Sequence, residues 1–328
     1  MRKIVPDQAS LETLKQRYAK RGWVVNESTE RQILVIEGAV VLSNSAGAAP
    51  GQRIELDNKK IIFVLPGPPR EFNAILNEHV VPWLRTQIIP EECLVRKIYM
   101  ICGLGESDVA VRLGDGVSFP PAGVSVAYCA RPGCIEVRLT VPEKNMDALK
   151  AAAEKVRKIL GHHIFAEASL LMEEVVGRLL AEHKATLATA ESCTGGYLGH
   201  RITSVSGSSV YYLGGVVAYS NEVKVRELGV KKATLEKSGA VSEETAREMA
   251  EGVRARFGTD YGLSVTGVAG PEGGTPEKPV GLVFVGLADK KTSWVRKFSF
   301  VGDRMVNKEW SSQMAMDLLR RCLLEVLK

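Results

Sequence analysis

The segment Ala188-Thr189-Ala190-Glu191-Ser192-Cys193-Thr194-Gly195-Gly196 decides how the second half of the chain is interpreted. The short apolar run at 184–190 predicts a buried strand, and helical apolar spacing resumes at Tyr197. We therefore expect a tight turn with Ser192 near a helix N-cap, where unpaired N–H groups can hold an anion or a developing oxyanion. A plain cap at Ser192 or Thr194, with glycines closing a turn, explains the same residues, so both interpretations stay open.

The composition indicates an ordinary globular protein. Of 328 residues, 45% are hydrophobic and 25% are charged, and the net charge is +5. This length predicts two or three domains. No apolar run reaches the roughly 18 residues of a membrane span, and the N-terminus lacks a signal-peptide apolar region, so we expect a cytoplasmic protein without a membrane partner. The basic residues are scattered, which favours small anionic ligands over nucleic acid.

The sequence carries no metal-binding pattern. Its six cysteines form no C-x-x-C pair, and its five histidines form neither H-x-H nor H-E-x-x-H. We therefore expect free thiols and no metal ion.

Residues 1–88 predict an α/β segment. Leu11, Leu14 and Tyr18 mark a helical face, 32–42 is strand-like, and 53–56 can pair with 60–65 as a hairpin across Asp57-Asn58. Proline-rich Pro66-Gly67-Pro68-Pro69 then leads into a helix.

Two motifs in this segment carry a family resemblance. The patterns N-x-x-G-x-A-P-G (Asn44 to Gly51) and L-P-G-P-P-x-E (Leu65 to Glu71) resemble the molybdopterin-binding, MoaB/MogA-like domain that opens CinA-family proteins. Ser45 departs from the pattern, in which proline is frequent. The family's Gly-Gly-x-Gly-Pro-Thr loop would lie upstream of Met1. The resemblance therefore implies a truncated domain, and we expect the family's ADP-ribose pyrophosphatase activity to be absent.

Residues 89–166 predict a small α+β module. A strand at 95–101, a helix with Val109 and Leu113, a hairpin and an amphipathic helix at 146–160 follow in the order β-α-β-β-α. With Gly103-Leu104-Gly105-Glu106-Ser107, this order resembles the KH-like linker domain of CinA proteins. RNA-clamping KH loops carry G-x-x-G with basic neighbours, whereas this loop is acidic, so nucleic acid is not an expected partner.

Residues 167–328 predict a larger α/β domain. Asn221 is the expected N-cap of a helix that ends at Gly229, which places Lys224 in its first turn, and Ser242 caps another helix. The ammonium group of Lys224 would face the positive end of the helix dipole. A solvated lysine is the alternative explanation for this position. We expect the remaining elements to be strands at 213–219, 261–266, 282–288 and 293–300, a long loop at 267–281, and a closing helix at 304–328.

Seven ordered motifs run through this domain. They are A-E-S-C-T-G-G from Ala190, G-S-S from Gly207, Y-S-N-E-x-K from Tyr219, G-A-V-S from Gly239, T-G-x-A-G-P-x-G-G from Thr266, K-P-V-G from Lys278 and G-D-R from Gly302. Together they resemble the CinA C-terminal, PncC-like domain. The resemblance implies hydrolysis of the nicotinamide mononucleotide carboxamide to nicotinic acid mononucleotide and ammonia, in pyridine nucleotide salvage, without metal or cofactor. It also implies a homodimer.

The residue types fit amide hydrolysis, which needs a nucleophile, a proton shuttle and oxyanion donors. We expect Ser192 to be the nucleophile, Lys224 its base, and Tyr219 the group that relays or orients the proton. Oxyanion donors are expected either in the helix amides near Thr194 and Gly195 or in those from Gly267 to Ala269. The expected ligands of the ribose phosphate are Arg304, Thr266 and Ser209.

Two alternatives accompany this hypothesis. Cys193 is a competing nucleophile, but no histidine lies near it in the sequence, and we expect a small buried residue. The second alternative is a non-catalytic, nucleotide-binding regulatory protein linked to competence or DNA damage. The combination of Ser192, Tyr219 and Lys224 favours the enzyme, because a binding module needs no such set.

Overall fold

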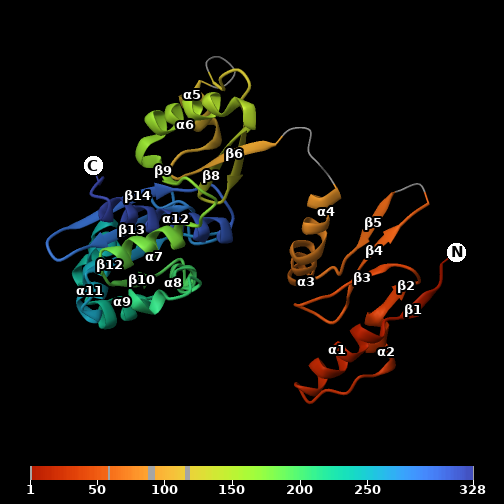
Figure 1. Cartoon of the computed structure of the whole chain (residues 1–328). Helices are drawn as coiled ribbons and strands as arrows, with labels where there is room; N and C mark the ends of the chain where they lie inside the picture. The colour runs from red at the N-terminus through yellow and green to blue at the C-terminus, as the bar shows by residue number, and fades with distance from the viewer. Residues whose placement is uncertain (1, 58–59, 88–92, 115–118, 328) are drawn as a thin grey trace. The chain divides into compact units, whose positions relative to one another are not determined.

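The computed structural model describes residues 2–57, 60–87, 93–114 and 119–327 (Figure 1). These form two compact units, residues 1–91 and 92–328, which we describe separately. The chain is a mixed α/β protein with several sheets. None of the described helices is long and apolar enough to cross a lipid bilayer. All six cysteines are free thiols, as expected.

The first unit contains two small antiparallel sheets. Strand β1 (Ile4–Pro6) pairs with β2 (Leu34–Ile36), and β3 (Val40–Leu42), β4 (Gly51–Glu55) and β5 (Ile61–Val64) form a second sheet in that order. The hairpin predicted at 53–56 and 60–65 is confirmed as β4 and β5, while Asn58 of its expected turn lies outside the described residues. The helical elements are α1 (Gln8–Ala19), α2 (Glu27–Glu30), η1 (Arg31–Ile33), α3 (Pro69–Ile75), η2 (Leu76–Val80) and α4 (Val81–Gln87).

One prediction in this unit is wrong. The expected single strand at 32–42 is two short strands, β2 and β3, because the chain turns at Gly38, where φ is 79°. The N–H of Ala39 donates to the carbonyl of Ile36 and closes this turn. Apolar composition alone did not reveal the glycine as the turning point.

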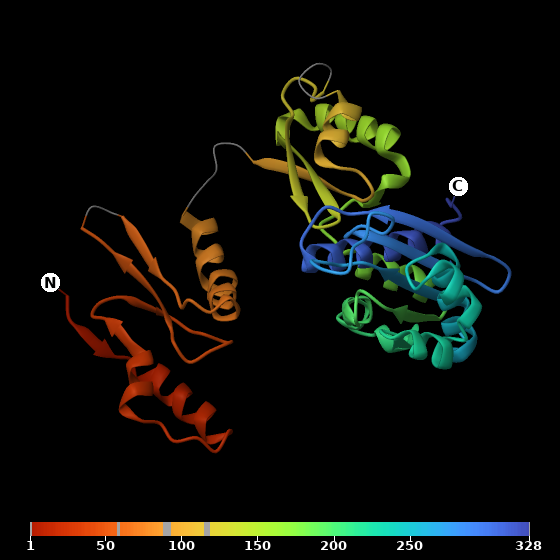
Figure 2. The same ribbon diagram turned by 180° about the vertical axis from the view of Figure 1, so that it is seen from behind.

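The second unit begins with the predicted β-α-β-β-α module. Its elements are β6 (Leu94–Ile101), α5 (Glu106–Leu113), β7 (Ser125–Arg131), β8 (Cys134–Pro142), η3 (Glu143–Asn145), α6 (Met146–Leu160), η4 (Gly161–His163) and β9 (Ile164–Ala166). The sheet order is β7-β8-β6-β9, with antiparallel neighbours. Helix α6 packs on β6 and β8, and α5 packs beside it (Figure 2). The helix face of Leu149, Val156 and Leu160 fills this core.

A five-stranded sheet follows in the same unit. Its order is β11-β10-β12-β13-β14, in which β10 pairs in parallel with β11 and β12, and the remaining neighbours are antiparallel. The strands are β10 (Leu187–Glu191), β11 (Tyr212–Val217), β12 (Tyr261–Gly267), β13 (Leu282–Ala288) and β14 (Ser293–Ser299). The helices are α7 (Met172–Glu182), α8 (Tyr197–Thr203), η5 (Ser208–Val210), α9 (Asn221–Leu228), α10 (Lys232–Ser238), α11 (Glu243–Phe257) and α12 (Arg304–Leu323).

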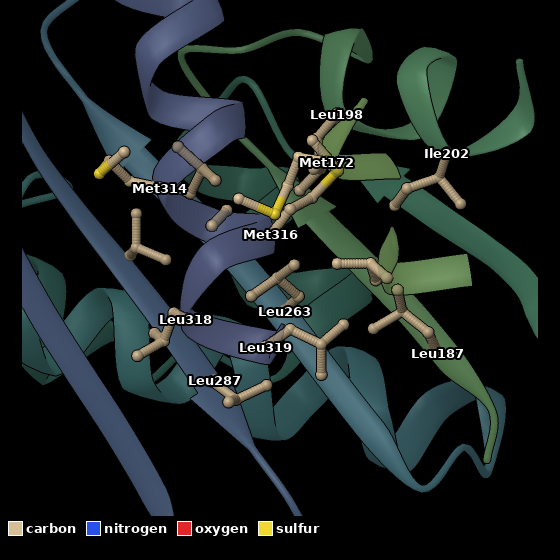
Figure 3. Packing of buried hydrophobic residues seen from close by; sticks show 14 of the residues in the cluster. Met172, Leu187, Leu198, Ile202, Leu263, Leu287, Met314, Met316, Leu318 and Leu319 are labelled. Atoms are coloured by element: carbon tan, nitrogen blue, oxygen red, sulfur yellow. The ribbon is translucent and has the colours of Figure 1, made fainter. Parts of the chain in front are cut away.

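Helices cover both faces of this sheet. Leu187 packs in the core formed with α7, α8 and α12, whereas the next residue, Ala188, packs against α9 and α11. This alternation is what a strand buried on both faces requires. Figure 3 shows Met316 and Leu319 of α12 lying among side chains of the sheet and neighbouring helices. The closing helix ends at Leu323 rather than 328, and residue 328 is not described.

Candidate active site

The carboxyl end of β10 delivers Ser192. Every residue of this strand is buried, and the N–H of Ser192 continues the ladder by donating to the carbonyl of Val265 at 2.9 Å. The Ser192 side chain is half-buried. Because β11 and β12 run parallel to β10, the carboxyl ends of all three strands meet at this edge of the sheet. Such an edge is where open α/β sheets bind ligands.

The turn after Ser192 differs from the predicted helix cap. Helix α8 begins only at Tyr197, with Gly196 in the N-cap position. Gly195 and Gly196 have φ values of 59° and 93°, a left-handed region that favours glycine. The N–H of Gly195 donates to the Ser192 carbonyl at 3.1 Å. Ser192 therefore precedes a tight turn and does not cap the helix.

Glu191 occupies the helix N-terminus that we expected to serve the oxyanion. Its buried carboxylate accepts hydrogen bonds from the N–H groups of Gly196, Leu198 and Gly199 at 3.0, 3.0 and 2.8 Å. The negative charge also faces the positive end of the α8 dipole. Because these N–H groups already donate to Glu191, the first turn of α8 does not supply the oxyanion site.

Helix α9 places Lys224 against Ser192. Its N-cap is Ser220, whose hydroxyl accepts from the Val223 N–H, rather than the predicted Asn221. The helix therefore starts at Asn221, and Lys224 is its fourth residue, just past the first three positions. The Lys224 side chain is 1% exposed, and its Nζ lies 3.0 Å from Ser192 Oγ. Nζ also donates to the carbonyl of Ala218 at 2.8 Å.

The surroundings of Lys224 favour its neutral amine. Burial lowers the pKa of this side chain, whereas the nearby Cys193 and Glu222 act weakly in the opposite direction. No carboxylate of the described chain forms an ion pair with its Nζ. A buried lysine without an ion-pair partner is the type of lysine that can accept a proton near neutral pH.

Cys193 points into the core. It is 7% exposed, and burial raises the pKa of its thiol to about 12. A thiol is a poor nucleophile when its thiolate is so strongly disfavoured. Its position agrees with a small buried residue next to the nucleophile candidate.

Tyr219 contacts Arg304 rather than Lys224. The Arg304 guanidinium donates to the Tyr219 hydroxyl at 2.9 Å and to the carbonyl of Gly270 at 2.8 Å. Only the backbone carbonyl of Tyr219 approaches Lys224 Nζ, at 3.5 Å. The predicted proton relay through the Tyr219 hydroxyl is therefore not supported by this geometry. Arg304 begins α12 next to the N-cap Asp303, as the sequence indicated.

Two predicted ligand side chains are buried in the fold. The Thr266 hydroxyl donates to the carbonyl of Ala240 at 2.7 Å, and its side chain is fully buried. The Thr194 side chain is also fully buried, and its hydroxyl has no hydrogen-bond partner in the described chain. At Gly267, which pairs with Val283, an added Cβ would lie 2.5 Å from the Leu282 carbonyl oxygen. These positions can offer backbone groups only.

The structure does not bring Ser209 to this site. In the parallel pair of β10 and β11, Leu187 lies opposite Tyr212 and Glu191 opposite Val217. Ser209 precedes Tyr212, so it lies at the amino ends of these strands, about 16 Å along the strand direction from the edge that carries Ser192. The order of motifs in the sequence did not indicate which end of a strand each motif occupies.

With this geometry established, comparison with known proteins identifies the family. The family model described as "CinA C-terminal domain" matches residues 170–323, and "Damage-inducible protein CinA KH domain" matches residues 96–166. A "Putative competence-damage inducible protein" of Clostridium tetani is 40% identical over 98% of this chain and 79% of its own length. This chain belongs to the CinA family.

Other CinA-family proteins are similarly related. A "Putative competence-damage inducible protein" of Thermoanaerobacter pseudethanolicus is 41% identical over 98% of this chain and 78% of that protein. The crystal structure of a "competence/damage inducible protein" from Agrobacterium tumefaciens is 34% identical, with a TM-score of 0.45, and covers 48% of this chain and 99% of that one. The names of these relatives associate them with competence or damage and state no reaction.

Asn307 is a further residue beside this site, and the sequence motifs did not indicate it. It lies one turn after Arg304 on α12, is fully buried, and donates to the carbonyls of Ala269 and Gly302, both at 3.0 Å. These bonds fasten the loop that follows β12 to the start of α12. The spacing of three residues from Arg304 is the only sequence signal for this role, because residues at that spacing share a helix face.

In the described chain, no three histidine, cysteine or acidic side chains are grouped so that they could hold a metal ion. What the site does offer is a hydroxyl next to a buried amine, with a guanidinium at its margin. This set can support acyl transfer from an amide to a serine.

Proposed function

We propose that this CinA-family chain hydrolyses the carboxamide of nicotinamide mononucleotide to nicotinic acid mononucleotide and ammonia. The observation that carries the proposal is the 3.0 Å contact between Lys224 Nζ and Ser192 Oγ, in a site where the lysine is almost completely buried. A serine hydroxyl becomes nucleophilic when an adjacent base takes its proton. The pair occupies the domain that matches the CinA C-terminal model.

In the proposed first step, the neutral Lys224 amine takes the Ser192 proton while Oγ attacks the carboxamide carbon. A C–O bond forms, and the carbonyl electrons move to oxygen. The Lys224 ammonium then gives its proton to the amide nitrogen, the C–N bond breaks, and ammonia leaves. In the second step, Lys224 takes a proton from water as the water attacks the acyl-enzyme. The bond between the acyl carbon and Ser192 Oγ then breaks, the Lys224 ammonium returns the proton to Oγ, and the carboxylate product leaves.

The oxyanion needs backbone donors that the fold has not already used. The N–H groups of Ser192, Gly195 and Gly196 all have protein acceptors. Those of Thr194 and Ala269 have no acceptor in the described part of the chain, and we assign the oxyanion to them. They come from the turn after β10 and from the loop after β12, which meet at the same edge of the sheet.

Arg304 is our candidate for the phosphate ligand. It is exposed at the start of α12, and its guanidinium has donors to spare beyond those bound to Gly270 and Tyr219. A guanidinium matches the geometry of a phosphate better than an ammonium does. Tyr219, whose side chain is 60% exposed, holds this guanidinium in place.

The direct test is ammonia release from nicotinamide mononucleotide by the purified chain, with and without a chelator, beside Ser192→Ala. We expect the wild type to release ammonia under both conditions and the variant to lose at least about a thousandfold in kcat. Nucleotide binding without ammonia release in the wild type would reject the enzyme and favour the regulatory alternative. Full turnover by Ser192→Ala would reject the assigned nucleophile.

A further inference from the structure

A cavity of about 610 Å³ lies where the KH-like module meets the five-stranded domain, within residues 92–328. Its charged and aromatic lining comes from η4, β14 and α12. These residues are His162, His163, Arg296, Phe298, Asp317 and Arg321. None of them belongs to the site proposed for amide hydrolysis.

The walls of this cavity are held together by hydrogen bonds across the two modules. Arg320, 2% exposed, donates to the carbonyl of His162 at 2.7 Å and to Asp317 Oδ1 at 2.7 Å. Within the KH-like module itself, the N–H of Cys102 donates to the carbonyl of His163 at 2.9 Å. The cavity is therefore part of a packed junction, and its side chains are positioned before any ligand arrives.

The Asp317 carboxylate in the lining is shared by two guanidinium groups. Both oxygens of Asp317 are engaged, Oδ1 by Arg320 and Oδ2 by Arg321 Nε at 2.7 Å. One carboxylate thus faces two guanidinium groups, and Arg296 of β14 also lines the cavity. Arg321 uses only Nε in this ion pair, so the outer nitrogens of its fork are free of Asp317.

Two histidines of the lining are in surroundings that favour their neutral form. Burial, with Arg321 as a further cause, lowers the pKa of both His162 and His163. His163 Nδ1 lies 3.1 Å from the Cys102 carbonyl, which favours the tautomer with the proton on Nδ1 and leaves Nε2 for a ligand. An anion in the cavity would favour protonation, so that Nε2 could donate as well.

The loop that begins at Gly103 borders this cavity. Gly103 has φ of 77°, and a Cβ at this position would lie 3.3 Å from an outer nitrogen of Arg321. A side chain here would crowd the guanidinium, so the glycine keeps the approach open. The Gly103-Leu104-Gly105 motif, which does not fit an RNA clamp, thus has a local role beside Arg321.

The same two elements, β14 and α12, also give the cavity an apolar lining. Phe298 is half-buried and stacks on Phe300 with ring centroids 5.7 Å apart, and Met314 and Leu318 of α12 line the same cavity. Cavities that combine apolar walls with a few fixed polar groups are typical small-molecule sites. A ligand that suits this mixed lining carries an anionic group and an apolar ring.

We propose that this junction cavity binds a phosphorylated small molecule that carries an apolar ring, such as a nucleoside monophosphate. The site is separate from the one at Ser192, because Arg304 and Arg321 lie on the same straight helix about 25 Å apart at 1.5 Å per residue. The proposal does not depend on the reaction that the other site performs.

The test uses the whole chain and two probes, inorganic phosphate and AMP, measured by calorimetry in an Arg304→Gln background that weakens the other site. We expect AMP to bind more tightly than phosphate, and Arg296→Gln to weaken both about tenfold. Phe298→Leu should weaken AMP and leave phosphate unchanged. Arg226→Gln, an exposed change on α9, is the matched control and should alter neither.

A second readout keeps the proposal testable if a variant unfolds. AMP added to the Arg304→Gln protein should shift the ring NMR signals of His163 and raise its pKa, while leaving those of His200 on α8 in place. Binding that is unaffected by Arg296→Gln, or histidine spectra that do not respond to AMP, would overturn the proposal.

Discussion

The guanidinium of Arg304 donates a 2.9 Å hydrogen bond to the hydroxyl of Tyr219, which lies 85 positions earlier in the chain. This contact ties the end of β11 to the start of α12. It also takes the Tyr219 hydroxyl away from Lys224. The two residues therefore form one structural unit, and we propose that Tyr219 is a positioning residue.

Tyr219→Phe tests this assignment. The variant loses the acceptor for Arg304 but keeps the ring, and Arg304 retains its bond to the Gly270 carbonyl. We expect KM for nicotinamide mononucleotide to rise about threefold and kcat to change by less than about twofold. Steady-state kinetics distinguish this from a proton relay, because loss of a relay would lower kcat by about a hundredfold.

Arg304→Ala should act on the phosphate end of the substrate. Removing the guanidinium should raise KM for nicotinamide mononucleotide about 10- to 100-fold while kcat largely persists. Nicotinamide riboside, which lacks the phosphate, should be hydrolysed equally well by variant and wild type. Arg256→Ala is a control, since Arg256 is paired with Glu227 on the surface. An equal loss with both substrates would remove the phosphate role.

Lys224 should give the reaction its pH dependence. Only the neutral amine can take the Ser192 proton, so kcat/KM should rise about tenfold per pH unit below the Lys224 pKa and level off above it. Because burial lowers that pKa, the plateau should begin below the 10.5 of an ordinary lysine. Lys224→Met should abolish this pH response and cost about 100- to 10,000-fold in kcat. Lys237→Met, an exposed change on α10, should retain both rate and profile.

Cys193→Ala should leave catalysis intact. The thiol is buried and its pKa is raised to about 12, so it supplies almost no thiolate at neutral pH. We expect kcat of Cys193→Ala to lie within about threefold of the wild type. We also expect Ser192→Ala to be inactive although Cys193 is present, because the thiol does not replace the serine as nucleophile. Iodoacetamide labelling with mass spectrometry should find Cys193 unmodified in the folded chain while exposed Cys93 reacts. Rapid labelling of Cys193 with loss of activity would contradict this assignment.

The sequence predicted local structure better than it predicted which side chains contact one another at the site. Helix-start chemistry put α9 within one residue of its true start, and the pairing of Ser192 with Lys224 followed from the family motifs. Glu191 was visible only as the carboxylate that ends an apolar run; its three bonds to α8 depend on how the turn folds back. The prediction that Ser209 binds the phosphate is not supported, because a sequence motif does not show which end of a strand it occupies.

The domain boundaries at 88 and 166, the homodimer and the loss of pyrophosphatase activity stay predictions. The predicted phosphate ligands differ in whether their side chains are available to a ligand. Arg304 reaches the surface, whereas the Thr266 hydroxyl is used by the Ala240 carbonyl. This distinction depends on which side chains are buried and which hydrogen bonds they make, and only the folded structure shows both.

Glu191→Ala should loosen the turn that presents Ser192. The variant leaves three N–H groups of α8 without their carboxylate acceptor, and hydrogen bonds to a charged group are worth about 1.5–3 kcal/mol each when a partner is removed. We expect a local loss of about 3 kcal/mol, measured as faster hydrogen exchange at the Leu198 and Gly199 amides, together with reduced kcat. Glu191→Gln should lie between variant and wild type, because one amide oxygen can still accept.

The matched control for Glu191 is Glu182→Ala, which removes an exposed carboxylate at the end of α7. It should change the exchange of the α8 amides by less than about 0.5 kcal/mol, as expected for a surface substitution. Faster exchange confined to α8 in Glu191→Ala would mean that the carboxylate holds the nucleophile turn in place. Unchanged exchange at Leu198 and Gly199 would mean that the glycine turn is stable without it, and the position of Ser192 would then have to depend on the β10 ladder and Lys224 alone.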